Sequence, residues 1–154
     1  MEKVCLGWRE WVALPDLEVK RIKVKVDTGA RTSALHAEDI RVFRRRGQPK
    51  VSFTLYPFQR SRRGAVHVEA DLVEKRVVRS SVGVETQRPV IRTHLELAGH
   101  RRLIEVTLVN RDIMGFRMLL GREAIKGCYL VDPGHSFLQS SRSGKNGKEV
   151  ARKK

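Results

Sequence analysis

The sequence predicts an all-β fold: a small closed barrel with one short helix near its C-terminal end. Many short segments carry apolar residues at every second position, which is the pattern of strands with one buried face. Gly and Pro separate these segments, as they do at the turns of β proteins. The length of 154 residues suits one domain with a sizeable core.

The first predicted strands lead to the most informative turn of the chain. One strand is expected over residues 8–14, where the two tryptophans are interpreted as core and edge packing. Pro15 and Asp16 close it, and a second strand is expected over residues 19–26, directly before Asp27. In that second strand the apolar residues Ile22, Val24 and Val26 alternate with the basic residues Arg21, Lys23 and Lys25.

The rest of the chain is predicted to continue as short strands. A hairpin or flap pair is expected from residues 77–84 and 88–97. An apolar strand at residues 118–120 runs through Gly121 and Arg122 into the short helix-like segment. The remaining strands are predicted at residues 39–43, 51–55, 66–72 and 103–109, with a turn at 44–50, a loop at 56–64 and a last ordered segment ending at Gly134.

Composition divides the chain and limits its environment. Residues 1–138 are predicted to fold, and the basic residues 139–154, rich in Ser, Gly and Lys, are predicted to be disordered.

The net charge of +15 favours acidic partners: nucleic acid, an acidic peptide or an anionic membrane. No apolar run approaches the ~20 residues that cross a bilayer. The N-terminus lacks the pattern of a signal peptide, and two cysteines are few for a secreted scaffold, so a cytoplasmic protein without a membrane partner is expected.

Asp27, Thr28 and Gly29 stand where the second predicted strand ends. A carboxylate in this position, followed by a small hydroxyl residue and a glycine, can be held by backbone N–H groups in a tight turn. Such a turn either ends a strand as an ordinary Asx-type turn or presents a catalytic acid. The three residues alone leave both interpretations open.

Longer motifs carry a family resemblance that favours the catalytic interpretation. The chain resembles the retropepsin-like aspartic proteases, whose protomer has Asp-Thr-Gly-Ala early and an apolar-apolar-Gly-Arg junction late. It is more closely similar to the RimB-like proteins, a small bacterial family labelled ATP-dependent zinc proteases. The matching segments are residues 7–11, 26–35, 88–90, 110–114 and 118–123, and the resemblance covers roughly residues 4–138.

The resemblance implies an aspartic endopeptidase, and carboxylate chemistry implies a homodimer. Peptide hydrolysis needs two carboxyl groups that share one proton: one activates water, and the other polarises the carbonyl. The chain has one Asp-Thr-Gly, and Asp112 and Asp132 lack its strand-turn-glycine context. The second Asp27 is therefore predicted to come from another copy related by a C2 axis.

The resemblance also assigns roles to the neighbours of Asp27. Thr28 is expected to link the two turns across the axis, and Gly29 is expected to admit the substrate backbone. Asp27, Thr28 and Gly29 are thus the predicted catalytic residues. Ala30 is expected to keep the pocket wall small, and with Arg31 and Arg88 it forms the predicted substrate-binding set.

Arg31 departs from the viral retropepsins, which commonly have an acid at this position, and fits the RimB-like pattern. It can bind a substrate carboxylate bidentately, or it can form a surface ion pair with Glu38 or Asp39. Arg88, after the predicted flap, is a weaker candidate for the same role. RimB-like proteins are associated with a ligase that adds glutamates to a ribosomal protein. The resemblance therefore implies a poly-glutamate tail as substrate and the ligase as a partner.

The residues support neither the zinc nor the ATP of the family label, and no cofactor or metal is predicted. The chain has no His-Glu-x-x-His, no Cys-x-x-Cys and no phosphate-binding Gly-x-x-x-x-Gly-Lys-[Ser/Thr] loop.

A rival interpretation is a non-catalytic basic barrel that binds the ribosome or RNA. It would use the basic residues between 44 and 63 and the tail at 139–154. The chain lacks the interleaved exposed aromatic residues of an RNA-stacking surface, so nucleic acid is the secondary expectation.

Overall fold

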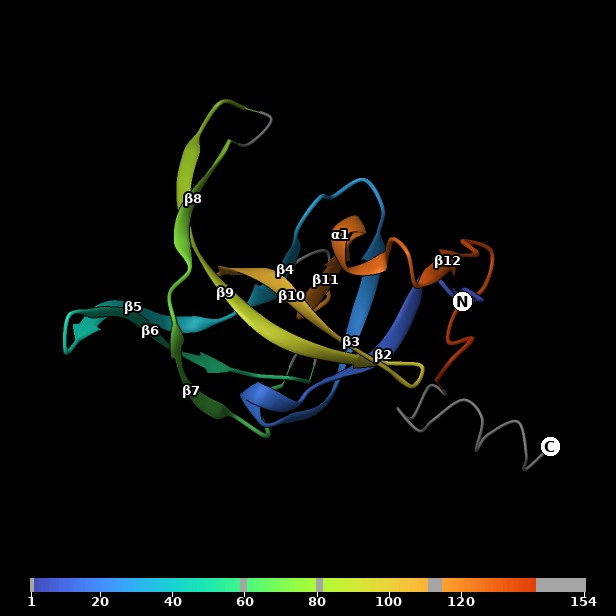
Figure 1. The fold of residues 1–154 in the computed structure, drawn as a ribbon, viewed down its shortest axis with the longest axis horizontal. Helices are drawn as coiled ribbons and strands as arrows, with labels where there is room; N and C mark the ends of the chain where they lie inside the picture. Colours follow the sequence, from blue (N-terminus) through green and yellow to red (C-terminus); the bar gives the residue numbers. More distant parts are fainter. Residues whose placement is uncertain (1, 59–60, 80–81, 111–114, 141–154) are drawn as a thin grey trace.

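The computed structural model describes residues 2–58, 61–79, 82–110 and 115–140 (Figure 1). Strands dominate it, with one 3-10 helix, η1 (Pro15–Leu17), and one α-helix of four residues, α1 (Arg122–Ile125). The strands are β1 (Val4–Leu6), β2 (Arg9–Leu14), β3 (Val19–Asp27), β4 (Ser33–His36), β5 (Glu38–Arg45), β6 (Gln48–Leu55), β7 (Val66–Asp71), β8 (Glu74–Arg79), β9 (Glu85–Leu97), β10 (His100–Val109), β11 (Met118–Gly121) and β12 (Tyr129–Val131).

Six of the strands form a closed ring, which confirms the all-β barrel. The order is β10-β4-β11-β3-β2-β9, and β9 pairs again with β10 to close it. β8 pairs with the first part of β9, so the β8–β9 hairpin projects from the ring on the side of the β3–β4 turn (Figure 1). β5, β6 and β7 form a separate sheet, and β1 pairs with β12 in parallel.

The predicted alternation of β3 sets which of its faces enters the core. Val19, Ile22, Val24 and Val26 are buried, while the basic residues between them stay half-buried or exposed. Successive side chains of a strand point to opposite faces of the sheet, so each ring strand sends every second side chain into the interior. There they pack against the buried residues of β3. The central core includes Leu35, Ile91, Leu95, Val106, Leu108, Met118 and Leu120.

A buried carboxylate fastens the end of the described chain to the ring. Glu10 of β2 has no exposed surface and accepts hydrogen bonds from the backbone N–H of Gly7 and of Leu138, both at 2.8 Å. The Ser140 hydroxyl donates a further bond of 2.7 Å. These donors compensate for the loss of water around the buried charge. Gln139 and Ser140, the first residues of the predicted tail, are therefore anchored, and residues 141–154 lie outside the described residues.

Several parts of the chain differ from the predicted elements, among them the β5–β6 turn, the unpredicted strands β1 and β4, and β8, which begins at Glu74 and not at residue 77. The turn predicted at residues 44–50 is only Arg46 and Gly47, because Arg45 pairs with Gln48 across the β5–β6 hairpin. Both turn residues have positive φ, 52° and 78°, as a tight two-residue hairpin turn requires. The terminal strand β1 was not predicted, because three residues are too short for alternation to be visible. Among the described residues, no helix has the length and apolar character needed to span a bilayer.

Candidate active site

Asp27 ends β3 and begins a tight turn. Its carboxylate Oδ1 accepts a hydrogen bond of 3.0 Å from the backbone N–H of Gly29, and its carbonyl accepts one of 3.2 Å from Ala30. The side chain is half-buried, while Thr28 and Gly29 are exposed. The turn thus fixes the carboxylate by a short-range contact and leaves it accessible.

The junction between β11 and α1 supports this turn from the neighbouring position in the sheet. β11 runs parallel to β3, with Gly121 in register with Asp27. The backbone N–H of Gly121 donates to the Ser33 hydroxyl at 3.0 Å, and that of Arg122 donates to the Ala30 carbonyl at 2.8 Å. These bonds join segments that are far apart in the sequence, so the turn depends on the closed ring.

Gly121 is required by the closeness of this contact. A Cβ at this position would lie 2.6 Å from the Thr32 carbonyl carbon and 2.9 Å from the Arg31 oxygen. Both are backbone atoms that cannot rotate away, so the junction excludes every residue with a side chain.

The Arg122 guanidinium closes the outer side of the turn. Its Nη1 donates to the carbonyls of Gly29 at 3.2 Å and of Thr28 at 3.4 Å. The carbonyls are held by the arginine, and the Gly29 N–H remains directed at the carboxylate.

Arg31 is exposed at the edge of the turn, as its predicted role in substrate binding requires. The alternative ion-pair partner Glu38 is instead bound by His36 at 3.2 Å and Arg62 at 3.2 Å. Arg31 lies near Glu123: the pKa of Glu123 is lowered mainly by a hydrogen bond from Lys126 and, less strongly, by the charge of Arg31.

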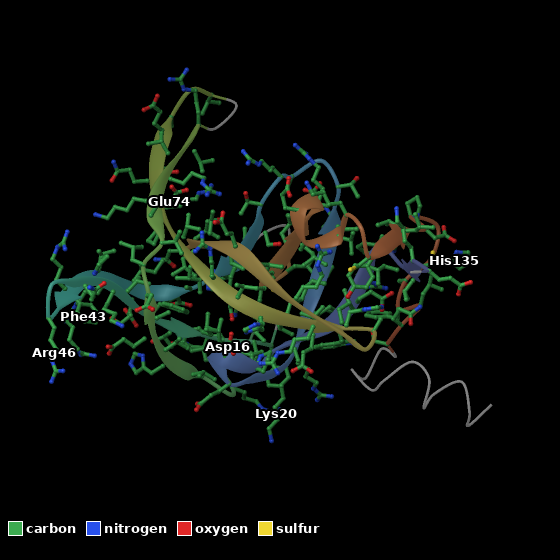
Figure 2. The ribbon with its side chains drawn as sticks, viewed as in Figure 1. Asp16, Lys20, Phe43, Arg46, Glu74 and His135 are labelled. Atoms are coloured by element: carbon green, nitrogen blue, oxygen red, sulfur yellow. The ribbon has the colours of Figure 1, made fainter. Side chains whose placement is uncertain are left out.

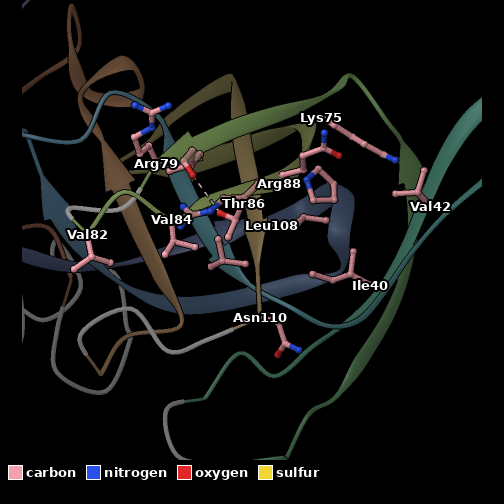
Figure 3. Close-up of a pocket in the computed structure, with 14 residues that line it drawn as sticks. Ile40, Val42, Lys75, Arg79, Val82, Val84, Thr86, Arg88, Leu108 and Asn110 are labelled. Atoms are coloured by element: carbon pink, nitrogen blue, oxygen red, sulfur yellow. Dashed lines mark hydrogen bonds between the residues drawn. The ribbon is translucent and has the colours of Figure 1, made fainter.

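Arg88 lies apart from the turn, in a groove beneath the β8–β9 hairpin (Figure 3). The groove has a volume of about 930 Å³, and Asp27 is not among its lining residues. Apolar side chains form much of its lining: Ile40, Val42, Val78, Val82, Val84, Pro89, Leu108 and Val109. The basic residues Lys75, Arg79 and Arg88 and the polar residues Thr86, Gln87 and Asn110 complete it. Within one protomer, the predicted residues thus fall into two sets, the turn at residues 27–31 and this groove.

Arg76 connects the hairpin to the turn, and sequence reasoning did not identify it. From β8, its Nη1 donates to the Thr32 hydroxyl at 3.1 Å, and its Nη2 donates to Glu105 at 3.0 Å. The hydrogen bond from Arg76 is the main cause of the lowered pKa of Glu105. No local pattern in the sequence singles out Arg76, because Thr32 and Glu105 are 44 and 29 residues away along the chain.

Replacing Arg76 by Gln is expected to lower stability by about 1 kcal/mol, since charged hydrogen bonds at a half-exposed site are lost. If the turn is catalytic, as the resemblance implies, kcat/KM should fall about tenfold. The control is Arg92→Gln, because Arg92 contacts the same Glu105 at 3.4 Å but does not reach Thr32. Peptidase kinetics and thermal melting measure both variants. Equal losses of activity in the two would show that the contact to Thr32 has no role.

The described histidines do not gather into a ligand set. His94 contacts Asp16 at 2.7 Å, and His135 contacts Asp132 at 2.8 Å, each as a separate pair. Within the described ranges, no group of three or more His, Cys, Asp or Glu side chains is arranged to hold a metal ion.

Comparison with known proteins identifies a family model that covers most of the chain. A family model described as RimB-like, retropepsin-like aspartic endopeptidase RimB, matches residues 5–142. Proteins of Shewanella halifaxensis and Shewanella pealeana, each named "Probable alpha-L-glutamate ligase", are 49% identical over 135 residues. The match covers 88% of this chain and 30% of each ligase, so the chain spans less than a third of these curated relatives. A crystal structure of Lpg0085 from Legionella pneumophila, a protein of unknown function, has a TM-score of 0.71 and 30% identity, covering 88% of this chain and 98% of that one.

Proposed function

Because the chain belongs to the RimB-like family of retropepsin-like aspartic endopeptidases, we propose that it hydrolyses peptide bonds through Asp27 and an activated water. The observation that carries the proposal is the turn itself. The Asp27 carboxylate is accessible, bound by the Gly29 N–H, and supported by the Gly121–Arg122 junction. A carboxylate fixed in this way costs little reorganisation when it takes a proton from water.

The reaction needs a second carboxyl group, which a second copy of the chain would supply. The prediction that Asp132 lacks a strand-turn-glycine context is wrong, because Asp132 follows β12 and binds the Gly134 N–H at 3.0 Å. Its other carboxylate oxygen is occupied by His135 at 2.8 Å, and Asp112 lies outside the described residues. In a C2 dimer, each Asp27 would meet its equivalent, and the exposed Thr28 of each turn would contact the other. One Asp27 would then deprotonate water while the protonated one polarises the scissile carbonyl.

Specific activity is therefore expected to fall on dilution, because the monomer has half of the dyad. In the dissociated range, the initial rate should rise with about the square of protein concentration. Rate measurements over a dilution series, with the mass followed by sedimentation, test this. A protein that is monomeric by mass and still has constant specific activity would contradict the dimer.

The proposed substrate is an acidic, glutamate-rich tail, such as that of a glutamylated ribosomal protein. The net charge of +15 gives the surface a field that attracts such a chain. The relatives named as glutamate ligases contain a region similar to this chain beside other sequence, which suits two activities on one glutamate chain. Arg31 at the turn and Arg88 in the groove would bind substrate carboxylates, and a separate ligase would be a natural partner.

An oligo-glutamate peptide is expected to be cleaved faster than a neutral peptide of equal length. The advantage should largely disappear between about 0.01 M and about 1 M salt, because the screening length falls from about 30 Å to about 3 Å. Cleavage assays on both peptides across this range measure the effect. Equal rates at low salt would contradict the acidic substrate while leaving the peptidase proposal intact.

A non-catalytic basic module that binds the ribosome or RNA remains the second candidate, favoured by the same net charge. Such a module would bind its partner equally well with Asp27→Asn. Hydrolysis that is unaffected by a chelator would argue against the zinc of the family label.

A further inference from the structure

The outer face of β2 and β3 carries basic side chains that lead toward Asp27. Strand residues alternate and the inner face of β3 is buried, so every second residue before Asp27 points outward. On β2, Arg9 is in register with one of these residues. We call this surface the basic track, and it comprises Arg9, Arg21, Lys23 and Lys25.

Aromatic rings hold the cations of the basic track in place. The Nζ of Lys23 lies 5.7 Å from the ring centre of Trp11 and 5.9 Å from that of Phe116. The guanidinium carbon of Arg9 lies 4.7 Å from the ring centre of Trp8, and Trp8 packs edge to face on Phe116 at 6.1 Å. Because cations cover these ring faces, the rings position charge and are poorly suited to stack on nucleic-acid bases.

Carboxylates of the described chain do not neutralise the centre of the track. Neither Arg9 nor Lys23 forms an ion pair among the described residues. The pKa of Lys23 is lowered by burial and then by repulsion from Arg9. An anionic partner would relieve this repulsion.

By charge, neither the segment at residues 139–154 nor a second copy of the chain suits this basic surface. Residues 139–154 hold six Lys or Arg against Glu149 alone, and a second copy brings the same net charge of +15.

The spacing of the cations fits an extended acidic polypeptide. A strand advances about 3.3 Å per residue, so alternate residues of β3 are about 7 Å apart. An extended peptide presents the side chains of one side at the same interval. Alternate glutamates of such a chain can therefore each meet one cation of β3 without bending the backbone of either partner.

We propose that the basic track is a docking surface for an acidic polypeptide in extended conformation, whose course along β3 ends at Asp27. This inference rests on the proposed function and deepens it, because it assigns substrate contacts to residues outside the turn and the groove.

The chain's two tryptophans, Trp8 and Trp11, both contact the track, so their fluorescence reports its occupation. The test uses Asp27→Asn protein, in which binding is measured without hydrolysis. An oligo-glutamate of 9 residues, the length of β3, is expected to change the fluorescence. Adding Lys23→Gln should weaken its affinity about two- to fivefold, and adding Lys23→Arg, which keeps the charge, should retain the affinity.

The matched control is Arg46→Gln in the same background. It removes one charge at the far end of the β5–β6 arm, away from Lys20 at the start of β3 (Figure 2). The affinity of this variant for oligo-glutamate is expected to be unchanged. Thermal melting is used to check that each variant folds.

Equal losses in Lys23→Gln and Arg46→Gln would overturn the proposal, since net charge alone would then explain binding. If Lys23→Gln weakened the binding of an oligouridylate probe but not that of oligo-glutamate, the proposal would also be overturned. The track would then be a nucleic-acid surface. Binding that depends on Lys23, in a protein whose unsubstituted form hydrolyses nothing, would reject the peptidase proposal and keep the track.

Discussion

Asp27→Asn is expected to reduce peptide hydrolysis by at least about 10³-fold, because it removes the group that exchanges a proton with water. The fold should be unaffected. In the unsubstituted protein the Asp27 Oδ1 lies 3.0 Å from the Gly29 nitrogen, and Asn offers an Oδ1 at the same position. The side chain is also only half-buried. Steady-state kinetics measures the loss, and thermal melting should stay within about 0.5 kcal/mol of the unsubstituted protein.

Asp71→Asn is the matched control for this loss. The Asp71 side chain is 80% exposed and pairs with Lys50 at the surface of the β5–β6–β7 sheet, away from the turn. It makes the same chemical change and should leave activity unchanged. Residual hydrolysis by Asp27→Asn close to that of Asp71→Asn would remove the basis of the peptidase proposal.

Gly121→Ala is expected to destabilise the protein by about 3 kcal/mol and to abolish activity. The added Cβ would meet the Thr32 carbonyl carbon at 2.6 Å, so either β11 or the Asp27 turn must move. For a chain of this size the melting temperature should fall by about 6–12 °C. Calorimetry and kinetics on the same sample measure both effects.

Gly134→Ala provides the comparison for a tolerated methyl group. The nearest atom to its Cβ would be the Asp132 Oδ1 at 3.4 Å, an ordinary contact. It should change the melting temperature by little and keep activity. If Gly121→Ala were as stable and as active as Gly134→Ala, the close junction between β11 and the turn would not be needed for function.

The sequence predicted the fold class and the turn because both depend on short-range patterns. Alternation over β3 is visible within one segment, and it correctly separated the buried residues Ile22, Val24 and Val26 from the basic ones. The bond from Gly29 to Asp27 spans two residues, so the local sequence was sufficient to propose it. The residues assigned to catalysis and substrate binding stay predictions until they are tested by substitution.

Other features were invisible to the sequence because their partners are distant. Gly121 bonds to Ser33 across a separation of 88 residues, and Arg76 reaches Thr32 across 44. The tryptophans were interpreted as core and edge packing, and both are half-buried, with Trp8 packed on Phe116. The position of Arg9 and Lys23 over their rings was not predicted.

The sequence by itself determined that this chain is a β protein in which Asp27 ends a strand at a glycine turn, since periodicity and turn chemistry act over a few residues. Only the tertiary structure decided what surrounds that carboxylate. The parallel pairing of β11 with β3 brings Gly121 and Arg122 against the turn, and the pairing of β2 with β3 sets Arg9 beside the lysines. Strand pairing is chosen by burial of the whole core, which no single segment encodes.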